Sequence, residues 1–300
     1  MKHIILPTDF SKNAINASAY ALKLFKNERC TFHVVNCYAP IETSVRISNS
    51  IRNYDVPPNN NQINSQENLL KFISELKQIE SEPWHFFKTV SSSDLLVVTL
   101  KELIDHTGAE LIIMGTKGAS GLKEIFMGST TVHVIKTIKS CPVMAIPENF
   151  NFENPLEIAF ATDLFRFYSQ AELAPVLKLA KTFNSTIRIV NVSEKEQPLT
   201  EIQIFNLSII KKYFKEVPNY LCRTTFKNSI SKTLELFTEE LDIHLLALLN
   251  YQHGYLERAR RASIVKKVAF HTTIPLLIIP ELSMNISSKK SRGQTLASIV

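Results

Sequence analysis

The sequence predicts an α/β protein that contains two successive copies of a doubly wound, five-stranded parallel sheet. In the first 150 residues, short apolar runs alternate with segments whose apolar side chains recur every three or four residues. The pattern that opens the chain recurs near residue 158, and the pattern that closes the first half recurs near residue 275. A chain of 300 residues is long enough for two such domains.

Five strands and four helices account for the first domain, residues 1–150. Ser11 is suited to cap the start of the first helix. Residues 91–94 are suited to cap the start of the third helix, and Gly108 is suited to end it. Apolar runs predict strands at residues 3–6, 31–37, 84–90, 111–114 and 143–146. The helical periodicity predicts a first helix after Ser11 with Phe25 on its buried face, and further helices at about 66–79, through Ile104, and at about 129–140.

Residues 41–64 interrupt this alternation. They are polar, include Pro57 and Pro58 followed by three asparagines, and show no period. Such a segment is longer than most loops in compact domains. We therefore expect an insert here, mobile or acting as a lid.

The second domain, residues 151–281, repeats the first. The run 158–163 echoes 5–9 including its Thr-Asp pair, and 275–281 echoes 142–148. The offset between corresponding residues of the two copies falls from 154 (163 minus 9) at the start to 133 (275 minus 142) at the end. The second copy is therefore 21 residues shorter, which is about the size of the insert. The tail, residues 282–300, is polar with a basic cluster, and we expect it to be disordered. Between the echoed ends we predict strands at 186–192, 220–226 and 243–248 and helices at 170–183, 199–214 and 230–240.

A glycine-rich stretch connects the fourth strand of the first copy to the following helix. Four of the seven glycines lie within residues 115–129. Glycine lets a backbone approach a ligand closely, and the amides at a helix start attract anions, so the stretch is suited to phosphate. Its spacing fits neither the P-loop nor the dinucleotide fingerprint.

Asp9 follows the first strand, far from these glycines in sequence. With strand order 3-2-1-4-5, the winding reverses between strands one and four, and ligands bind beyond the carboxyl ends of strands at such a point. Asp9 and Gly115 are then expected to face one crevice. A carboxylate suits an exocyclic amine or a ribose hydroxyl, whereas amides and a hydroxyl at a helix start suit phosphate oxygens.

The spacing Gly115-x2-Gly118-x9-Gly128-Ser129 resembles the nucleotide-binding signature of the ATP-binding branch of the universal stress protein family. The resemblance covers about residues 1–281 as two copies, and it implies a nucleotide-binding α-hydrolase-like fold. It implies ATP as the ligand, with Mg²⁺ as a candidate companion ion. In that family's manner Asp9 would bind the adenine, and Cys37 would present its backbone to the base edge. The site residues that the resemblance implies are Pro7, Thr8, Asp9, Cys37, Met114, Gly115, Gly118, Gly128, Ser129 and Thr130.

The second copy departs from the motif. Its corresponding connection, residues 249–263, holds one glycine, and counting back from the shared proline places Arg261 where the first copy has Gly128. An arginine there obstructs the close approach of backbone to phosphate. We therefore expect the second domain not to bind ATP in the family manner.

Composition limits the other functions. No apolar run approaches the roughly 20 residues that span a bilayer, and a net charge of +6 without a dense basic patch gives no support for nucleic acid binding. The four cysteines lack metal or redox spacing, which is typical of a reducing compartment. The first residues enter a strand directly, without a secretory segment. These features predict a cytoplasmic protein.

Three functions are consistent with the sequence. The first is an ATP-binding regulatory module of the stress response. In this case its two copies pack through their fifth strands, as in family members. Two chains are expected to form a homodimer, and a separate regulatory partner, not identified by the sequence, is expected to bind. The second is a slow ATPase. The sequence offers no catalytic residue for it, because Asp9 is expected to bind the adenine and Glu124 is a remote candidate. The third is a scaffold, or a protein that binds a lipid or other apolar ligand between its domains.

Overall fold

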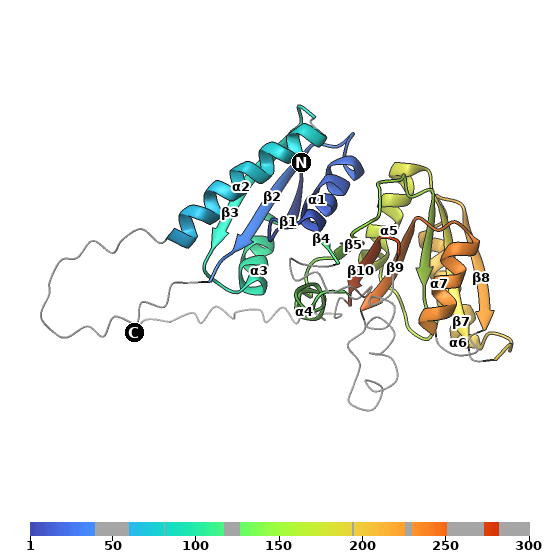
Figure 1. The fold of residues 1–300 in the computed structure, drawn as a ribbon. Coiled ribbons are helices and arrows are strands. Elements are labelled where there is room, and N and C mark those ends of the chain that lie inside the picture. Colours follow the sequence, from blue (N-terminus) through green and yellow to red (C-terminus); the bar gives the residue numbers. More distant parts are fainter. Residues whose placement is uncertain are drawn as a thin grey trace, which may run out of the picture.

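Ten strands form one continuous sheet in the computed structural model (Figure 1). The structure describes residues 1–39, 60–80, 82–116, 127–193, 195–225, 230–250 and 273–281, and the strands are counted within them. The strand order is β3-β2-β1-β4-β5-β10-β9-β6-β7-β8. Each half of the chain thus contributes five strands in the order 3-2-1-4-5, which confirms the predicted fold class.

The first half is a parallel sheet with helices on both faces. Alternate residues of its central strand point to opposite faces, because Ile4 and Leu6 pack in the core under α1 and α2 and Ile5 packs under α3 and α4. Its strands are β1 (Lys2–Pro7), β2 (Cys30–Cys37), β3 (His85–Ser92), β4 (Leu111–Gly115) and β5 (Val143–Ile146). Its helices are α1 (Lys12–Leu24), α2 (Asn60–Ile79), α3 (Leu96–Thr107) and α4 (Ser129–Thr137).

The second half repeats this arrangement. Phe160 of its central strand packs in the core under α5 and α6, and the neighbouring Ala159 packs in the core under α7. Its strands are β6 (Glu157–Ala161), β7 (Thr186–Ser193), β8 (Asn219–Thr225), β9 (Leu245–Asn250) and β10 (Leu276–Pro280). Its described helices are α5 (Gln170–Phe183), α6 (Glu201–Tyr213) and α7 (Ile230–Glu240).

The two halves join through their fifth strands. β10 pairs antiparallel with β5, with Leu277 opposite Met144, whereas the other strand pairs of the sheet are parallel. Asn250 at the end of β9 adds a 2.9 Å hydrogen bond from its side-chain amide to the carbonyl of Ile135 in α4. The expected packing of the copies through the fifth-strand edge is therefore observed.

Several predicted boundaries differ from those in the structure, among them the start of α2 and the end of β3. α2 begins at Asn60, so residues 60–64 of the predicted insert are helical, while residues 40–59 lie outside the described part of the chain. β3 runs on to Ser92 because it pairs with β2 as far as Cys37. Residues 91 and 92, expected as helix caps, are thus strand, and α3 has Leu95 as its N-cap without a side-chain bond.

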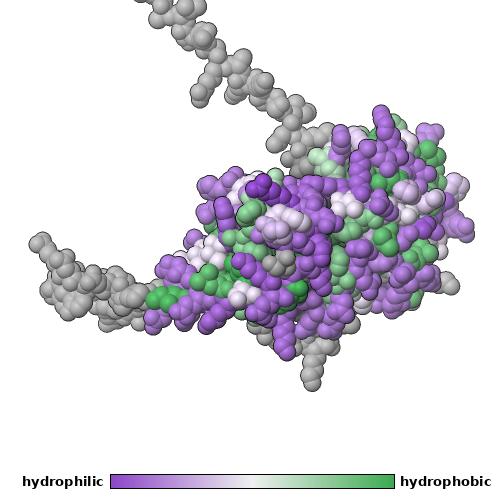
Figure 2. All heavy atoms as spheres, turned by 90° about the horizontal axis from the view of Figure 1, so that it is seen from above, coloured by the Kyte–Doolittle hydropathy of each residue, from purple (hydrophilic) through white to green (hydrophobic). Residues whose placement is uncertain are grey.

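The surface is mostly hydrophilic where it is seen in Figure 2, with hydrophobic residues interspersed. Some apolar side chains are well exposed on α6, where Ile202 is 60% and Phe205 is 62% accessible. Within the described residues, none of the helices combines the length and the apolar character that crossing a bilayer requires. The predicted tail, residues 282–300, lies outside the described part.

Candidate functional site

The carboxyl ends of β2, β1 and β4 lie next to one another at one edge of the sheet. β1 pairs with β2 on one side and with β4 on the other, so it is the strand at which the winding reverses. Thr8 and Asp9 follow β1, Cys37 ends β2, and Gly115 ends β4. The structure thus brings the first-strand aspartate and the start of the glycine stretch to the same edge.

A tight turn positions Asp9 after β1. The backbone amide of Thr8 donates to the carbonyl of Val35, at 2.8 Å, and the Thr8 hydroxyl accepts from the amide of Phe10. Asp9 Oδ1 accepts from the amide of Ser11 at 3.1 Å, and Phe10 has a positive φ of 63°. Because the turn itself binds one carboxylate oxygen, the exposed Asp9 side chain has a restricted orientation.

Ser11 is the N-cap of α1, as predicted. Its hydroxyl accepts from the amide of Ala14 at 3.2 Å. This bond belongs to the helix and leaves Ser11 with a structural role. The turn and the cap together direct the chain from β1 onto the face covered by α1.

A buried polar chain lies behind the turn and was missed by the sequence reasoning. Asn36 donates from Nδ2 to the carbonyl of Thr8 at 2.8 Å, and its Oδ1 accepts from the hydroxyl of Ser65 at 2.8 Å. The hydroxyl of Ser91 donates in turn to Ser65. Three elements, β2, α2 and β3, therefore support the residue before Asp9.

Cys37 ends β2 with its thiol directed toward α3. Its Sγ donates to the hydroxyl of Thr99 at 3.6 Å, and Thr99 donates to Ser92 at 3.1 Å. Burial raises the pKa of the Cys37 thiol above its ordinary value. The side chain is thus a neutral, half-buried thiol, which leaves the backbone as the part of Cys37 suited to a ligand.

Gly115 ends β4 where the backbone is in close contact with α1. A Cβ atom added at Gly115 would lie 2.6 Å from Cγ of Asn13, which requires that one of the two shift. The carbonyl of Gly115 accepts from the hydroxyl of Thr131 at 2.8 Å. Met114, one residue earlier, is buried in the core, so its side chain is not accessible to a ligand.

The start of α4 lies directly beyond β4. The amide of Gly128 donates to the carbonyl of Thr116 at 2.5 Å, and Gly128 is the N-cap without a side-chain bond. Ser129 and Thr130 are exposed at this helix start, whereas the next residue, Thr131, is buried. The helix start therefore presents two hydroxyls and its first-turn amides beside the end of β4. Gly118, with the rest of 117–126, lies outside the described residues.

The second half has the same turn at the end of β6. Thr162, Asp163 and Leu164 repeat it: Asp163 Oδ1 accepts from the amide of Phe165 at 3.0 Å, and Leu164 has a φ of 62°. Asn191 donates to the carbonyl of Thr162 at 3.1 Å, in the role of Asn36. The recurrence of Val-Asn at 35–36 and 190–191 was the sequence signal that could have identified Asn36.

The second half differs from the first beyond this turn. Arg166 bonds both Glu172 at the start of α5, at 2.5 Å, and Glu281 after β10, at 2.8 Å. In the first half Asn16 of α1 bonds carbonyls after β5 instead, among them that of Phe150 at 3.1 Å. The connection predicted to lack the phosphate motif falls mostly within residues 251–272, which lie outside the described part of the chain. Arg261 is one of these residues.

The site contains no metal centre in the described residues, where no three His, Cys, Asp or Glu side chains are grouped suitably for one. The fold and the crevice define the class of this protein. It is a tandem, doubly wound α/β protein with polar residues at the strand ends where the winding of its first half reverses.

Residues 1–147 match the model of the universal stress protein family. The first half of the chain therefore belongs to the universal stress protein family. A curated relative, Universal stress protein YxiE of Bacillus subtilis (strain 168), is 38% identical over 48 residues. This match covers 15% of the present chain and 32% of that protein, so it spans about a third of the relative's length.

Two solved structures are similar over nearly the whole chain. A universal stress protein from Archaeoglobus fulgidus DSM 4304 matches 93% of this chain and 96% of its own, with a TM-score of 0.64 and 16% identity. A putative universal stress protein from Pseudomonas aeruginosa UCBPP-PA14 matches 93% of each chain, with a TM-score of 0.59 and 12% identity. The likeness shows that both halves share the fold.

Proposed function

We propose that the first half of this chain binds ATP in the crevice between β1 and β4 and acts as a regulatory module. The observation that supports this most is that the Asp9 turn and the start of α4 lie at one edge of the sheet. The first offers a carboxylate for an amine or hydroxyl, and the second offers amides and hydroxyls for phosphate. A nucleotide has both kinds of group.

The residues divide into two parts along the nucleotide. Asp9 binds the adenine or ribose, with the backbone of Pro7, Thr8, Cys37 and Met114 beside it. The phosphates lie against Gly115, Gly118, Gly128, Ser129 and Thr130. Any Mg²⁺ that accompanied the nucleotide would be held mainly by phosphate oxygens and water, since Mg²⁺ commonly keeps several waters and few protein ligands.

Regulation follows from linkage. A nucleotide that prefers one arrangement of the segments around the crevice shifts their population and thereby changes the affinity for a partner.

We propose domain limits of 1–150 and 151–281, with the second domain retaining the Asp163 turn and not binding ATP. Because β5 and β10 already pair with each other, a homodimer would form through another surface, for which the exposed apolar side chains of α6 are available.

The location we propose is the cytoplasm. Cys30, Cys37, Cys141 and Cys222 are all free thiols. Burial raises the pKa of Cys30 and of Cys141 to about 12, which keeps both thiols neutral and unreactive. Free thiols of this kind suit a reducing compartment.

Equilibrium binding of labelled ATP to three proteins tests the proposal: the unchanged chain, Asp9→Asn and Asp163→Asn. Asparagine keeps the turn, so each variant loses one carboxylate charge at little structural cost. We expect Asp9→Asn to weaken ATP binding about tenfold, the effect of one hydrogen bond to a charged group, and Asp163→Asn to leave it unchanged. Equal affinities of all three proteins, or no binding by the folded unchanged chain, would contradict the proposal. Release of ADP under the same conditions would show an ATPase.

A further inference from the structure

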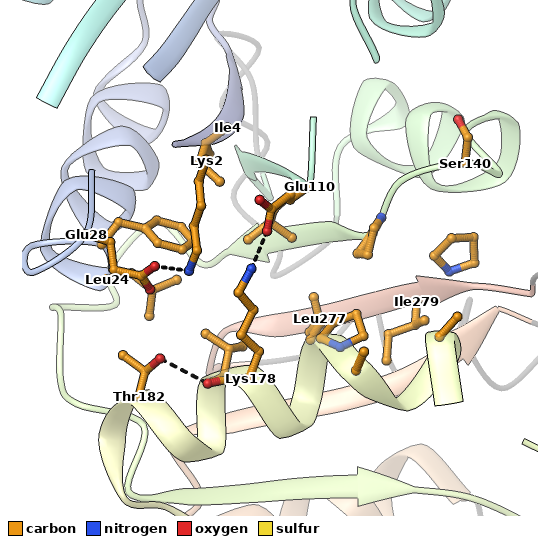
Figure 3. Close-up of a pocket in the computed structure, with 18 residues that line it drawn as sticks. Lys2, Ile4, Leu24, Glu28, Glu110, Ser140, Lys178, Thr182, Leu277 and Ile279 are labelled. Carbon is orange, nitrogen blue, oxygen red and sulfur yellow. Dashed lines mark hydrogen bonds and ion pairs between the residues drawn. The ribbon is translucent and has the colours of Figure 1, made fainter. Parts of the chain in front are cut away.

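A cavity lies between the two halves, at the opposite end of β1 from the ATP crevice. Its volume is about 320 Å³, and it is bordered by α1 of the first half and α5 of the second (Figure 3). The sheet provides its floor through Ile4 of β1, Leu111 of β4, and Leu277 and Ile279 of β10. β1 runs from Lys2, which borders the cavity, to Pro7, which belongs to the proposed ATP site, and these two residues are about 17 Å apart at the usual rise per strand residue.

The walls of the cavity are largely apolar. Leu24 and Phe25 at the end of α1 form one wall. The opposite wall is a stripe on α5 that repeats every three to four residues, so that it lies along one side of the helix. The members of this stripe are Ala171, Ala174, Pro175, Lys178, Leu179 and Thr182.

The charged groups around the cavity are paired with each other. Lys2 forms an ion pair with Glu28, and its ammonium also lies 5.1 Å from the centre of the Phe25 ring. Lys178 extends from α5 across to Glu110, before β4, and pairs with it, as Figure 3 shows. Two cations and two anions leave no net charge among these four side chains. An ionised ligand would gain little here, because each charge already has its counter-ion.

Small polar groups are few. Ser140 is exposed at the border of the cavity, and the Thr182 hydroxyl donates to the carbonyl of Lys178 at 3.0 Å. A site with one available hydroxyl and apolar walls suits a ligand with at most one hydrogen-bonding group. The volume is at the lower end of the range for small-molecule pockets, and it is too small for a folded partner.

We propose that this cavity between α1 and α5 binds a neutral, largely apolar small molecule, such as a medium-length alcohol. Water finds few partners along these largely apolar walls, so an apolar molecule of suitable size is the favoured occupant. The ligand contacts both halves, because its walls come from α1 and α5 and its floor includes strands of each. This site is separate from the ATP crevice, so either proposal can fail without the other.

The test uses the full-length chain and N-phenyl-1-naphthylamine, a neutral dye that fluoresces in apolar surroundings. We expect saturable binding of one dye per chain. 1-Decanol should displace the dye at concentrations at least tenfold lower than decanoate, which has the same chain length and a negative charge. Saturating ATP should leave the dye titration unchanged. Absence of saturable binding, or equal displacement by the alcohol and the carboxylate, would overturn the proposal.

A pair of variants locates the dye. Ala174 is exposed on the α5 wall, so Ala174→Phe fills the cavity without crowding the core. Lys212→Phe places the same side chain at an exposed position of α6, which does not border the cavity. We expect the dye's dissociation constant to rise at least tenfold in Ala174→Phe and to stay unchanged in Lys212→Phe, with both variants showing the circular dichroism of the unchanged chain. Equal dye affinity in the two variants would show that the dye binds elsewhere and would contradict the proposal.

Discussion

Asn36 donates a 2.8 Å hydrogen bond to the carbonyl oxygen of Thr8, the residue before the aspartate of the proposed ATP site. Asn191 makes the same bond to Thr162 in the second half, at 3.1 Å. Both asparagines are buried, at 9% and 3% exposure. The bond therefore belongs to the framework of each half, and only in the first half does it support a proposed ligand site.

Asn36→Ala should destabilise the protein and also weaken ATP binding. The change leaves the Thr8 carbonyl without its side-chain donor, and an unsatisfied buried polar group costs about 1–3 kcal/mol. Urea unfolding measures the loss of stability, and labelled ATP measures the affinity. The matched variant Asn191→Ala should lower stability by a similar amount and leave ATP affinity unchanged. If Asn191→Ala weakens ATP binding equally, the nucleotide does not rest on the Asp9 turn.

Gly115→Ala should disturb the contact between β4 and α1. The new Cβ would lie 2.6 Å from Cγ of the buried Asn13, so the helix or its side chain must move, at a cost of about 1–3 kcal/mol. We expect lower stability in urea and weaker ATP binding. The double variant Asn13→Ala with Gly115→Ala should recover part of the stability, because the clash is removed.

Gly108→Ala is the control for this change. Gly108 has a φ of +64° at the end of α3, and nothing lies within 4 Å of an added Cβ. The cost there is backbone strain alone, about 1 kcal/mol. ATP affinity should stay unchanged. Equal ATP affinity in the Gly115 and Gly108 variants would show that close approach at the end of β4 is irrelevant to binding.

Stability should fall with pH below neutrality through His33. Burial, with smaller effects of His3 and Lys88, lowers the pKa of His33 to about 4. The unfolded chain then binds the proton more readily than the folded one, so stability is complete above pH 6.5 and declines as pH falls toward 4. The expected loss at pH 5 is about 2 kcal/mol.

Urea unfolding at pH 7.5 and pH 5 measures this decline. His33→Gln removes the titrating group and keeps a side chain that can bond His3, which lies 2.9 Å from His33 between ring nitrogens. Between pH 7.5 and pH 5, the His33→Gln variant should therefore lose less unfolding free energy than the unchanged chain, and the difference should be about 2 kcal/mol. An unchanged pH dependence in this variant would assign the decline to other groups.

Arg166→Met should destabilise the second half. Glu172 is 1% exposed, and removal of its arginine leaves a buried carboxylate with less compensation, at a cost of about 3–5 kcal/mol. Arg166→Lys should recover only part of this, since lysine cannot bond two carboxylates in the planar geometry of arginine. Lys181→Met, which removes an exposed ion pair of the same helix with Glu216, should leave stability nearly unchanged. A loss as small for Arg166→Met as for Lys181→Met would contradict the assigned role.

Periodicity and repetition predicted most of the fold. α5 and α7 begin and end at the expected residues, and β5 occupies the predicted range, because their apolar patterns are bounded by clear caps and turns. The predictions failed where tertiary contacts decide the boundary. β3 continues through Ser92 because β2 is beside it, and in the first turn of α2, which begins at Asn60, Asn61 donates to the carbonyl of Ala39 at 2.9 Å.

The candidate site was less predictable than the fold. The sequence placed Asp9 and Gly115 at one edge because both follow strands that meet at the winding reversal. It did not predict Thr131, whose hydroxyl bonds the Gly115 carbonyl, or the contact between Gly115 and Asn13. These depend on which residue of a helix faces a strand end, and spacing alone does not settle that.

The union of β5 with β10 is made within a single polypeptide, so dilution does not separate the two halves. In a symmetric pair of identical subunits, every substitution appears twice and must be tolerated at both places. Here each half mutates alone. One copy can therefore preserve an inherited binding chemistry while its neighbour acquires a different one, and the shared sheet keeps both in a fixed ratio of one to one.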